Sequence, residues 1–362
     1  MSADVYRITL IAGVALALGV VLILVVTLIR IRRSILNRSR IRLRNELLDS
    51  WTNGSPDQIK RGLTQVATGS IRGLVDLSTA IEHAHRQGIW NHDLVRAIHA
   101  GVVASGLGAR ISRCLSDRRE THRGMAVVLS GLGITDIDEH TLATFLSDPE
   151  ATVRLAAAAS LEQYASPAAA QELIKALNFS LLEEPRIIER LGHPWAIPAI
   201  IDSLSIDQHT SATRSSLLTA LAISRDPRAL RCGLEQAAST SGEVLVRALR
   251  VVSACSTEAT PQQHDQIGSI AASVASSDNS AVRNLAASLL VYAEEPHRTK
   301  QLIEMTHDPD WFVRRSAIQS LLKCGPAGRN LVLELTQDPD PFTANRAQEE
   351  LARMEIRARK VG

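Results

Sequence analysis

The sequence predicts an all-α protein, an α-solenoid of helical hairpins preceded by one transmembrane helix. Three observations lead to this prediction. An uncharged apolar run near the N-terminus is long enough to cross a bilayer. Aromatic residues make up only 3% of the 362 residues, whereas the strong helix formers Ala and Leu recur throughout, with no clear alternating strand pattern. A short motif also returns after 30 residues, which is the length of one helical hairpin.

The transmembrane helix is predicted at residues 8–29, after a short extracytoplasmic tail at residues 1–7. The run contains 22 residues without a charge, and at ~1.5 Å per residue it spans the ~30 Å hydrocarbon core of a bilayer. A signal peptide fits less well, because only Arg7 precedes the run and no small-residue cleavage site follows it.

Residues 30–56 are predicted to form a basic juxtamembrane helix and linker that ends at a turn-rich stretch, 51–56. By the positive-inside rule, the arginines place the following domain in the cytoplasm of a plasma membrane protein with an external N-terminus. They either set this topology alone or also bind anionic lipid, at ~1 kcal/mol per residue. The arginines assigned to topology or lipid are Arg30, Arg32, Arg33, Arg38 and Arg40.

The rest of the chain is mildly acidic. Residues 45–362 hold 32 of the 40 basic residues and 37 of the 38 acidic residues. Proteins that grip nucleic acid through its phosphates usually have a basic folded domain, so nucleic acid is not expected as the main ligand. The preference for arginine over lysine is typical of a GC-rich genome and suggests a bacterial source.

A repeated motif defines residues 141–354 as the repeat array. Residues 57–140 are helical by pattern but do not show the motif, so they are predicted to be divergent repeats or an N-terminal cap. Residues 355–362 form a tail. The positions predicted to be structural in the repeats are Asp148, Pro149, Val153, Arg154, Asp278, Val282, Arg283, Asp308, Pro309, Val313 and Arg314.

Each position of the motif has a physical role. Asp is expected to cap the second helix of the hairpin, and Pro fits its first turn, where a missing N–H costs nothing. Val, Ala and Leu recur at helical spacing and face the next repeat, and the small Ala lets helices approach closely. The Arg after Val can reach a carboxylate of the adjacent repeat, which predicts a ladder of ion pairs.

This motif, D-P-x-x-x-V-R-x-x-A-x-x-x-L, resembles HEAT-like repeats of the type found in phycobilisome-lyase-like proteins. The copy at Asp278 departs from it, because Pro is missing and one residue fewer precedes Val282. The resemblance implies an α-solenoid whose long surface binds other proteins. Some relatives attach bilin chromophores or cleave glycosidic bonds in DNA, but no matching site is recognised in this sequence.

No catalytic arrangement stands out, so the sequence predicts that the chain is not an enzyme and has no cofactor or metal ion. Five histidines lie between residues 83 and 122, without Cys or acidic residues at a familiar metal-ligand spacing. This pattern favours histidines that are scattered over the surface. The alternative is a metal- or ligand-binding sensor or enzyme that uses them. These histidines are His83, His85, His92, His99 and His122.

The leading interpretation is a membrane-tethered cytoplasmic scaffold or adaptor that binds another protein. By analogy alone, an integral membrane enzyme such as an envelope glycosyltransferase suits the role of partner. Trp195 and Trp311 are the candidate partner-binding residues, because Trp is frequent at binding hot spots, although Trp195 also fits a packed position. A homo-oligomer is a further alternative, but residues 8–29 contain no Gly-x-x-x-Gly pair.

Overall fold

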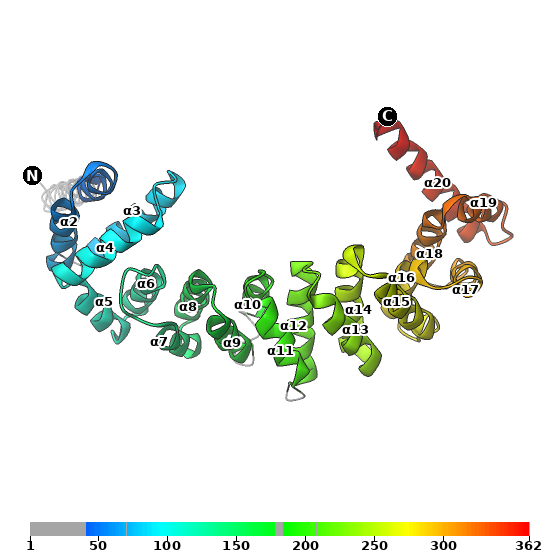
Figure 1. The fold of residues 1–362 in the computed structure, drawn as a ribbon, viewed down its shortest axis with the longest axis horizontal. Helices are drawn as coiled ribbons and strands as arrows, with labels where there is room; N and C mark the ends of the chain where they lie inside the picture. Colours follow the sequence, from blue (N-terminus) through cyan, green and yellow to red (C-terminus); the bar gives the residue numbers. More distant parts are fainter. Residues whose placement is uncertain (1–40, 70, 178–183, 207–208, 362) are drawn as a thin grey trace, which may run out of the picture. The chain divides into compact units, whose positions relative to one another are not determined.

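The chain forms two helical units in a computed structural model (Figure 1). Among the described residues the regular structure consists of α-helices and short 3-10 helices, which confirms the prediction of an all-α fold. The structure describes all residues except 1–40, 70, 178–183, 207–208 and 362. Of the described residues, unit 1 holds those within 41–145 and 152–160, and unit 2 holds those within 146–151 and 161–361.

Unit 1 packs its helices around one apolar core. The helix 41–53 comes first, and its residues Leu47 and Trp51 are buried in that core, although the sequence suggested a boundary at residue 57. Ser55 and Gln58 then form a capping box that starts α2. The helices that follow in unit 1 are α2 (Pro56–Thr68), α3 (Arg72–Arg86), α4 (His92–Ser105), α5 (Leu107–Leu115), α6 (Glu120–Gly131) and α7 (Glu139–Ala143). The helices η1 (Thr144–Ser147) and α8 (Ala151–Tyr164) have residues in both units.

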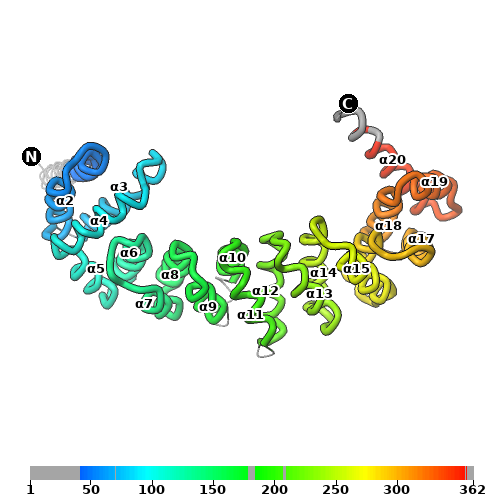
Figure 2. The backbone as a smooth tube through the Cα atoms, in the orientation of Figure 1, coloured from blue at the N-terminus to red at the C-terminus, as the bar shows by residue number. Residues whose placement is uncertain are grey.

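Unit 2 is a series of helical hairpins that follow one another in chain order (Figure 2). First helices α9, α11, α13 and α15 contact each other in turn, and second helices α10, α12, α14, α16, α18 and α20 do the same. Two such rows make an α-solenoid. The helices are α9 (Pro167–Ala176), α10 (Glu184–Leu191), α11 (Ile197–Ser205), α12 (Ser211–Ser224), α13 (Ala229–Ser239), α14 (Gly242–Cys255), η2 (Ser256–Glu258), α15 (Pro261–Val274), α16 (Ser280–Leu289), η3 (Leu290–Tyr292), α17 (His297–Met305), α18 (Trp311–Lys323), α19 (Gly325–Leu335) and α20 (Pro341–Val361).

The small apolar residues of the motif form the core between repeats. Val282 and Val313 are buried on the second helices α16 and α18, and Ala286 is fully buried one turn after Val282. In α8, Val153 is also fully buried, while its neighbour Arg154 is half-buried. This stripe lets second helices of successive repeats pack closely, as the helical spacing predicted.

The aspartates of the motif do not cap the second helices, and this part of the prediction is wrong. Asp308 Oδ1 accepts the backbone N–H of Asp310 at 2.8 Å, and Asp310 caps α18 instead. Pro309 therefore lies just before the cap and not in the first turn. Asp148 likewise accepts the N–H of Glu150, the residue before α8. An aspartate bonded two residues ahead makes a turn of its own, and proline stiffens this turn.

Ser277 explains the irregular copy of the motif. Its Oγ accepts the backbone N–H of Asn279 at 3.3 Å, and Asn279 caps α16. Ser277 therefore occupies the position that Asp308 has in the next repeat, and Asp278 is an exposed residue between the turn and the cap. Counted from Ser277, the distance along the chain to Val282 is the same as in the other copies.

The predicted ion pair between repeats is present at Arg283. Its Nε and Nη2 donate to the two carboxylate oxygens of Asp308 at 2.7 and 2.9 Å, and its Nη1 donates to the carbonyl oxygen of Ser277 at 2.8 Å. The side chains of Arg283 and Asp308 are only 15% and 8% exposed. Arg314 pairs instead with Asp340 at 3.9 Å, so this second contact is longer.

The predicted transmembrane helix, the tail before it and the arginines after it lie outside the described residues. Within the part that the structure does describe, no single helix is long and apolar enough to cross a membrane. The consecutive helices α4 and α5 meet that test only when they are taken together, with a bend of 85° between them.

Replacing Arg283 with Ala is expected to lower the free energy of unfolding by about 2 kcal/mol, because it leaves the buried Asp308 carboxylate without its charged donor. Urea unfolding followed by circular dichroism measures this loss. The matched control is Arg231→Ala, whose exposed pair with Glu235 is worth less than about 1 kcal/mol. Equal effects of the two substitutions would contradict a stabilising role for the inter-repeat pair.

The contribution of this pair is also expected to depend on pH. Burial raises the pKa of the Asp308 carboxyl, but the hydrogen bond from Arg283, the amide of Asp310 and the nearby charges outweigh burial and lower it. A lowered pKa in the folded state stabilises above the unfolded pKa of about 3.9, and this stabilisation disappears as the pH falls further. The stability difference between wild type and Arg283→Ala should therefore shrink below about pH 4, measured by unfolding at a series of pH values.

Candidate partner-binding surface

Aromatic side chains stand at the N-terminal ends of α18 and α20. Asp310 caps α18 by accepting the N–H of Phe312 at 2.8 Å, and Asp340 accepts the N–H of Phe342 at 3.1 Å. Capping fixes the first turn of each helix, where side chains reach solvent. Trp311, Phe312 and Phe342 are 40%, 61% and 67% exposed. Among the described residues, no other Trp, Phe or Tyr side chain is as exposed.

Arginines from the same two helices stack on these rings. The Cζ of Arg346 lies 4.2 Å from the ring centre of Trp311, and that of Arg315 lies 5.5 Å from it. The Cζ of Arg314 lies 5.2 Å from the ring centre of Phe342. Such cation–π contacts hold an exposed ring in one orientation. The aromatic–arginine surface is defined here as Trp311, Phe312, Arg314, Arg315, Phe342 and Arg346.

A buried carboxylate joins the two helices beneath this surface. Glu350 is 5% exposed and accepts hydrogen bonds from Arg353 at 2.8 Å and from Gln319 at 2.9 Å. The Nε of Arg315 lies 3.3 Å from Glu350 Oε1, without the alignment of a hydrogen bond. A groove of about 420 Å³ continues from here between α18 and α20, lined by Arg315, Gln319, Leu322, Lys323, Glu350, Arg353 and Met354.

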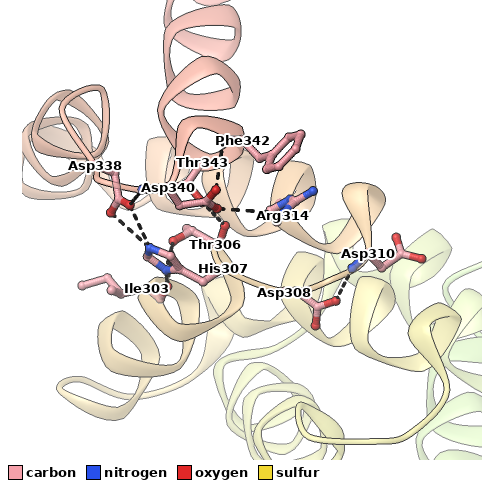
Figure 3. A network of polar contacts seen from close by, with 10 residues as sticks. All are labelled: Ile303, Thr306, His307, Asp308, Asp310, Arg314, Asp338, Asp340, Phe342 and Thr343. Carbon is pink, nitrogen blue, oxygen red and sulfur yellow. Dashed lines mark hydrogen bonds and ion pairs between the residues drawn. The ribbon is translucent and has the colours of Figure 1, made fainter.

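A second polar network fixes the start of α20 (Figure 3). The Thr343 hydroxyl lies 2.7 Å from the carbonyl oxygen of Thr306 and 2.8 Å from Asp340 Oδ2. Next to it, His307 Nε2 lies 3.1 Å from both carboxylate oxygens of Asp338. The hydrogen bond from Thr343 is the main cause that lowers the pKa of Asp340, against the opposing effect of burial. The capping carboxylate is therefore ionised at neutral pH, and it keeps Phe342 in place.

The two tryptophans singled out in the sequence lie in different surroundings. Trp311 is part of the aromatic–arginine surface, whereas Trp195 is half-buried in the turn between α10 and α11. A role in binding stays a prediction for both. Phe312 and Phe342 were missed, because nothing in an isolated phenylalanine distinguishes an exposed position from a packed one.

The five histidines between residues 83 and 122 do not converge. Among the described residues, no group of three His, Cys, Asp or Glu side chains is placed to hold a metal ion. His83 lies beside the Thr79 carbonyl, His85 stacks on Trp90, His99 pairs with Asp136, His122 pairs with Asp117, and His92 is exposed at the start of α4.

The cysteines are free thiols of low reactivity. Burial raises the pKa of Cys232 and of Cys255 to about 11. Burial also raises the pKa of Cys114 and of Cys324. Since the thiolate is the nucleophile, these protonated thiols are poor candidates for covalent chemistry at neutral pH.

One further copy of the repeat turn lies in the region without the motif. Asp117 Oδ1 accepts the N–H of Arg119, the residue before α6, at 2.8 Å. Arg123 Nη1 donates to the carbonyl oxygen of Asp117 at 2.9 Å, in the manner of the later repeats. His122 stands where the motif has Val, which conceals the copy. The signal was available, because Asp117 precedes Asp148 by 31 residues.

Comparisons with known proteins identify the repeat. The family model described as "PBS lyase HEAT-like repeat" matches residues 153–179. A search of the curated proteins finds no match. Solved structures similar to this chain include an engineered protein, with 14% identity and a TM-score of 0.39, which covers 86% of this chain and 99% of its own. The complex of CpcE and CpcF of phycocyanin lyase from Nostoc has 18% identity and a TM-score of 0.25, covering 82% and 92%.

The repeat match supports the predicted resemblance to HEAT-like repeats and corrects another prediction. The sequence led to the expectation that the chain is not an enzyme, yet the repeat that it matches is named for a lyase. That expectation is therefore wrong as it stands, because it rested on the absence of a familiar motif. Stacked repeats form one extended surface, so residues far apart in sequence can share a site that no local sequence motif reveals.

Replacing Glu350 with Ala is expected to lower the free energy of unfolding by about 3 kcal/mol, because Arg315, Arg346 and Arg353 would then face each other around an empty position. Urea unfolding with hydrogen exchange on α20 measures the loss. The control Glu349→Ala removes a carboxylate that is 52% exposed and should cost less than about 1 kcal/mol. If Glu350→Ala left the free energy of unfolding unchanged, the carboxylate would not be what joins α18 to α20.

Proposed function

We propose that this helical-repeat protein binds a partner protein through the aromatic–arginine surface. The observation that carries the proposal is the gathering of three largely exposed aromatic side chains on two neighbouring helices, in a chain with only 3% aromatics. Exposed apolar side chains that cluster on a surface mark interaction sites more often than scattered ones do. Trp and Arg are also enriched among the residues that dominate binding energies.

The chemistry of the surface defines the partner segment. Phe312 and Phe342 offer an apolar centre, which suits a partner with apolar side chains. Arg315 and Arg353 are 36% and 45% exposed at the edge, where they can reach carboxylates of the partner. Arg346 is 9% exposed and supports Trp311 from below, so it is not offered to the partner.

We place this partner at a membrane. The proposal is supported by the uncharged run 8–29 in the sequence and by the arginines that follow it. An anchor would hold the repeats near the bilayer and raise their effective concentration toward membrane proteins. An integral membrane enzyme, such as an envelope glycosyltransferase, is the partner class that this arrangement suits by analogy.

A lyase activity is the second candidate, and the observation that favours it is the match of residues 153–179 to a lyase repeat. The assay mixes the purified chain with phycocyanin apoprotein and a free bilin, and follows covalent attachment by absorbance after denaturation. Attachment that needs the chain would establish the activity. If the bilin attached equally fast without the chain, the proposed lyase activity would be rejected.

The double substitution Phe312→Ala and Phe342→Ala is expected to weaken capture of the partner while changing the free energy of unfolding by less than about 1 kcal/mol, because both rings are mostly exposed. The measurement is crosslinking of the full chain in native membranes, followed by titration with the purified partner. Leu333→Ala is the matched control, since Leu333 is 48% exposed on α19 and outside the surface. The affinity should fall at least tenfold in the double variant and stay unchanged in the control.

Two results would overturn the proposal. In the first, a partner that crosslinks to wild type also binds the double variant with the same affinity. In the second, the control loses binding as completely as the double variant, which would mean that any apolar surface residue matters. Recovery of the protein alone from membranes would favour the self-assembling alternative.

A further inference from the structure

A second surface feature lies on the second helices of unit 2, away from the aromatic–arginine surface. A cavity of about 380 Å³ opens between α12 and α14. Three of its six lining residues are arginines and none is acidic, unlike the cavity lined by Glu184 and Glu243 or the groove lined by Glu350. The lining residues are Thr219, Ala222, Ile223, Arg225, Arg247 and Arg250.

Local structure places the three arginines around this cavity. Arg225 is the C-cap of α12 and has a φ of 52°, a left-handed conformation that turns the chain away from the helix axis. Arg247 and Arg250 are three residues apart on α14, so they share one face of that helix. The Thr219 hydroxyl donates to the carbonyl oxygen of Ser215 at 2.7 Å, so the arginines are the donors left for a ligand.

Two of these three arginines have no ion-pair partner in the described part of the chain. Arg247 pairs with Glu243 at 2.7 Å. Within the described part of the chain, the guanidinium groups of Arg225 and Arg250 make no hydrogen bond and no ion pair. The nearest acidic neighbour in sequence, Asp226, is instead bound by Arg228 at 2.6 Å, and this hydrogen bond is the main cause that lowers its pKa. Two guanidinium groups thus face one cavity without a counter-ion.

We propose that this cavity binds a phosphate-type oxyanion. Guanidinium groups bind phosphate oxygens through paired N–H donors, and a phosphomonoester carries a charge of about −2 at pH 7, which matches the two unpaired arginines. Ala222 and the 53% exposed Ile223 supply an apolar wall for the group that carries the phosphate. The site does not depend on the partner-binding surface, and each can fail without the other.

The test is isothermal titration of the full chain with inorganic phosphate at constant ionic strength, with chloride as the background anion. The wild type is compared with Arg225→Gln, Arg250→Gln and the double variant. Each substitution is expected to weaken binding on the order of tenfold, since it removes charge-assisted hydrogen bonds. The control is Arg231→Gln on α13, a residue that is 86% exposed and lies outside the cavity, and it should bind as wild type does.

Circular dichroism and the unfolding midpoint verify that each variant is folded. Titrations with phosphoserine and with glycerol phosphate then identify the source of the phosphate. Tighter binding of phosphoserine indicates a phosphorylated side chain of a partner, and tighter binding of glycerol phosphate indicates a small molecule or a lipid headgroup. Absence of saturable phosphate binding by the wild type, or equal binding by the double variant, would overturn the proposal.

Discussion

The carboxylate of Asp308 connects the local turn of one repeat with the packing of the next. One of its oxygens accepts the N–H of Asp310 and so shapes the turn that starts α18. Both oxygens also accept hydrogen bonds from Arg283 of the preceding second helix. The side chain of Asp308 is only 8% exposed. Burying a carboxylate costs free energy unless it is paired and hydrogen-bonded, and these donors offset that cost. The start of a helix and its distance from the neighbouring helix are therefore set by the same group.

Other repeats form the turn before the second helix with different residues, and a comparison shows which feature they share. Ser277 makes the turn with a hydroxyl, and Asp117 makes it in a region without the full motif. At Asp338 the carboxylate still accepts the N–H of Asp340, but its partner in the preceding repeat is His307. The acceptor two residues before the cap is the common element, while the donor from the preceding repeat is Arg283 at Asp308 and His307 at Asp338.

The sequence predicted the packing of the repeated motif well, but it did not predict features that lie outside the motif. Helical spacing predicted the buried stripe at Val282 and Val313, and the Arg283 pair followed from it. The cap was predicted two residues too early, because Asp is favoured both as a cap and in the turn before one. The aromatic–arginine surface combines side chains of two helices, such as Trp311 of α18 and Arg346 of α20, so it follows only from how α18 packs on α20.

The exposed aromatic residues are informative because the capping of their helices does not depend on their side chains. Asp310 and Asp340 cap their helices by binding backbone N–H groups, and any side chain at the first turn would leave these bonds intact. Val313 differs, since it is fully buried and its size is fixed by the neighbouring repeat. In a solenoid each repeat packs only on its neighbours, so the outward positions of a second helix are free to vary. Such positions can therefore carry the aromatic side chains on which the proposed partner binding rests, as at Phe312 and Phe342.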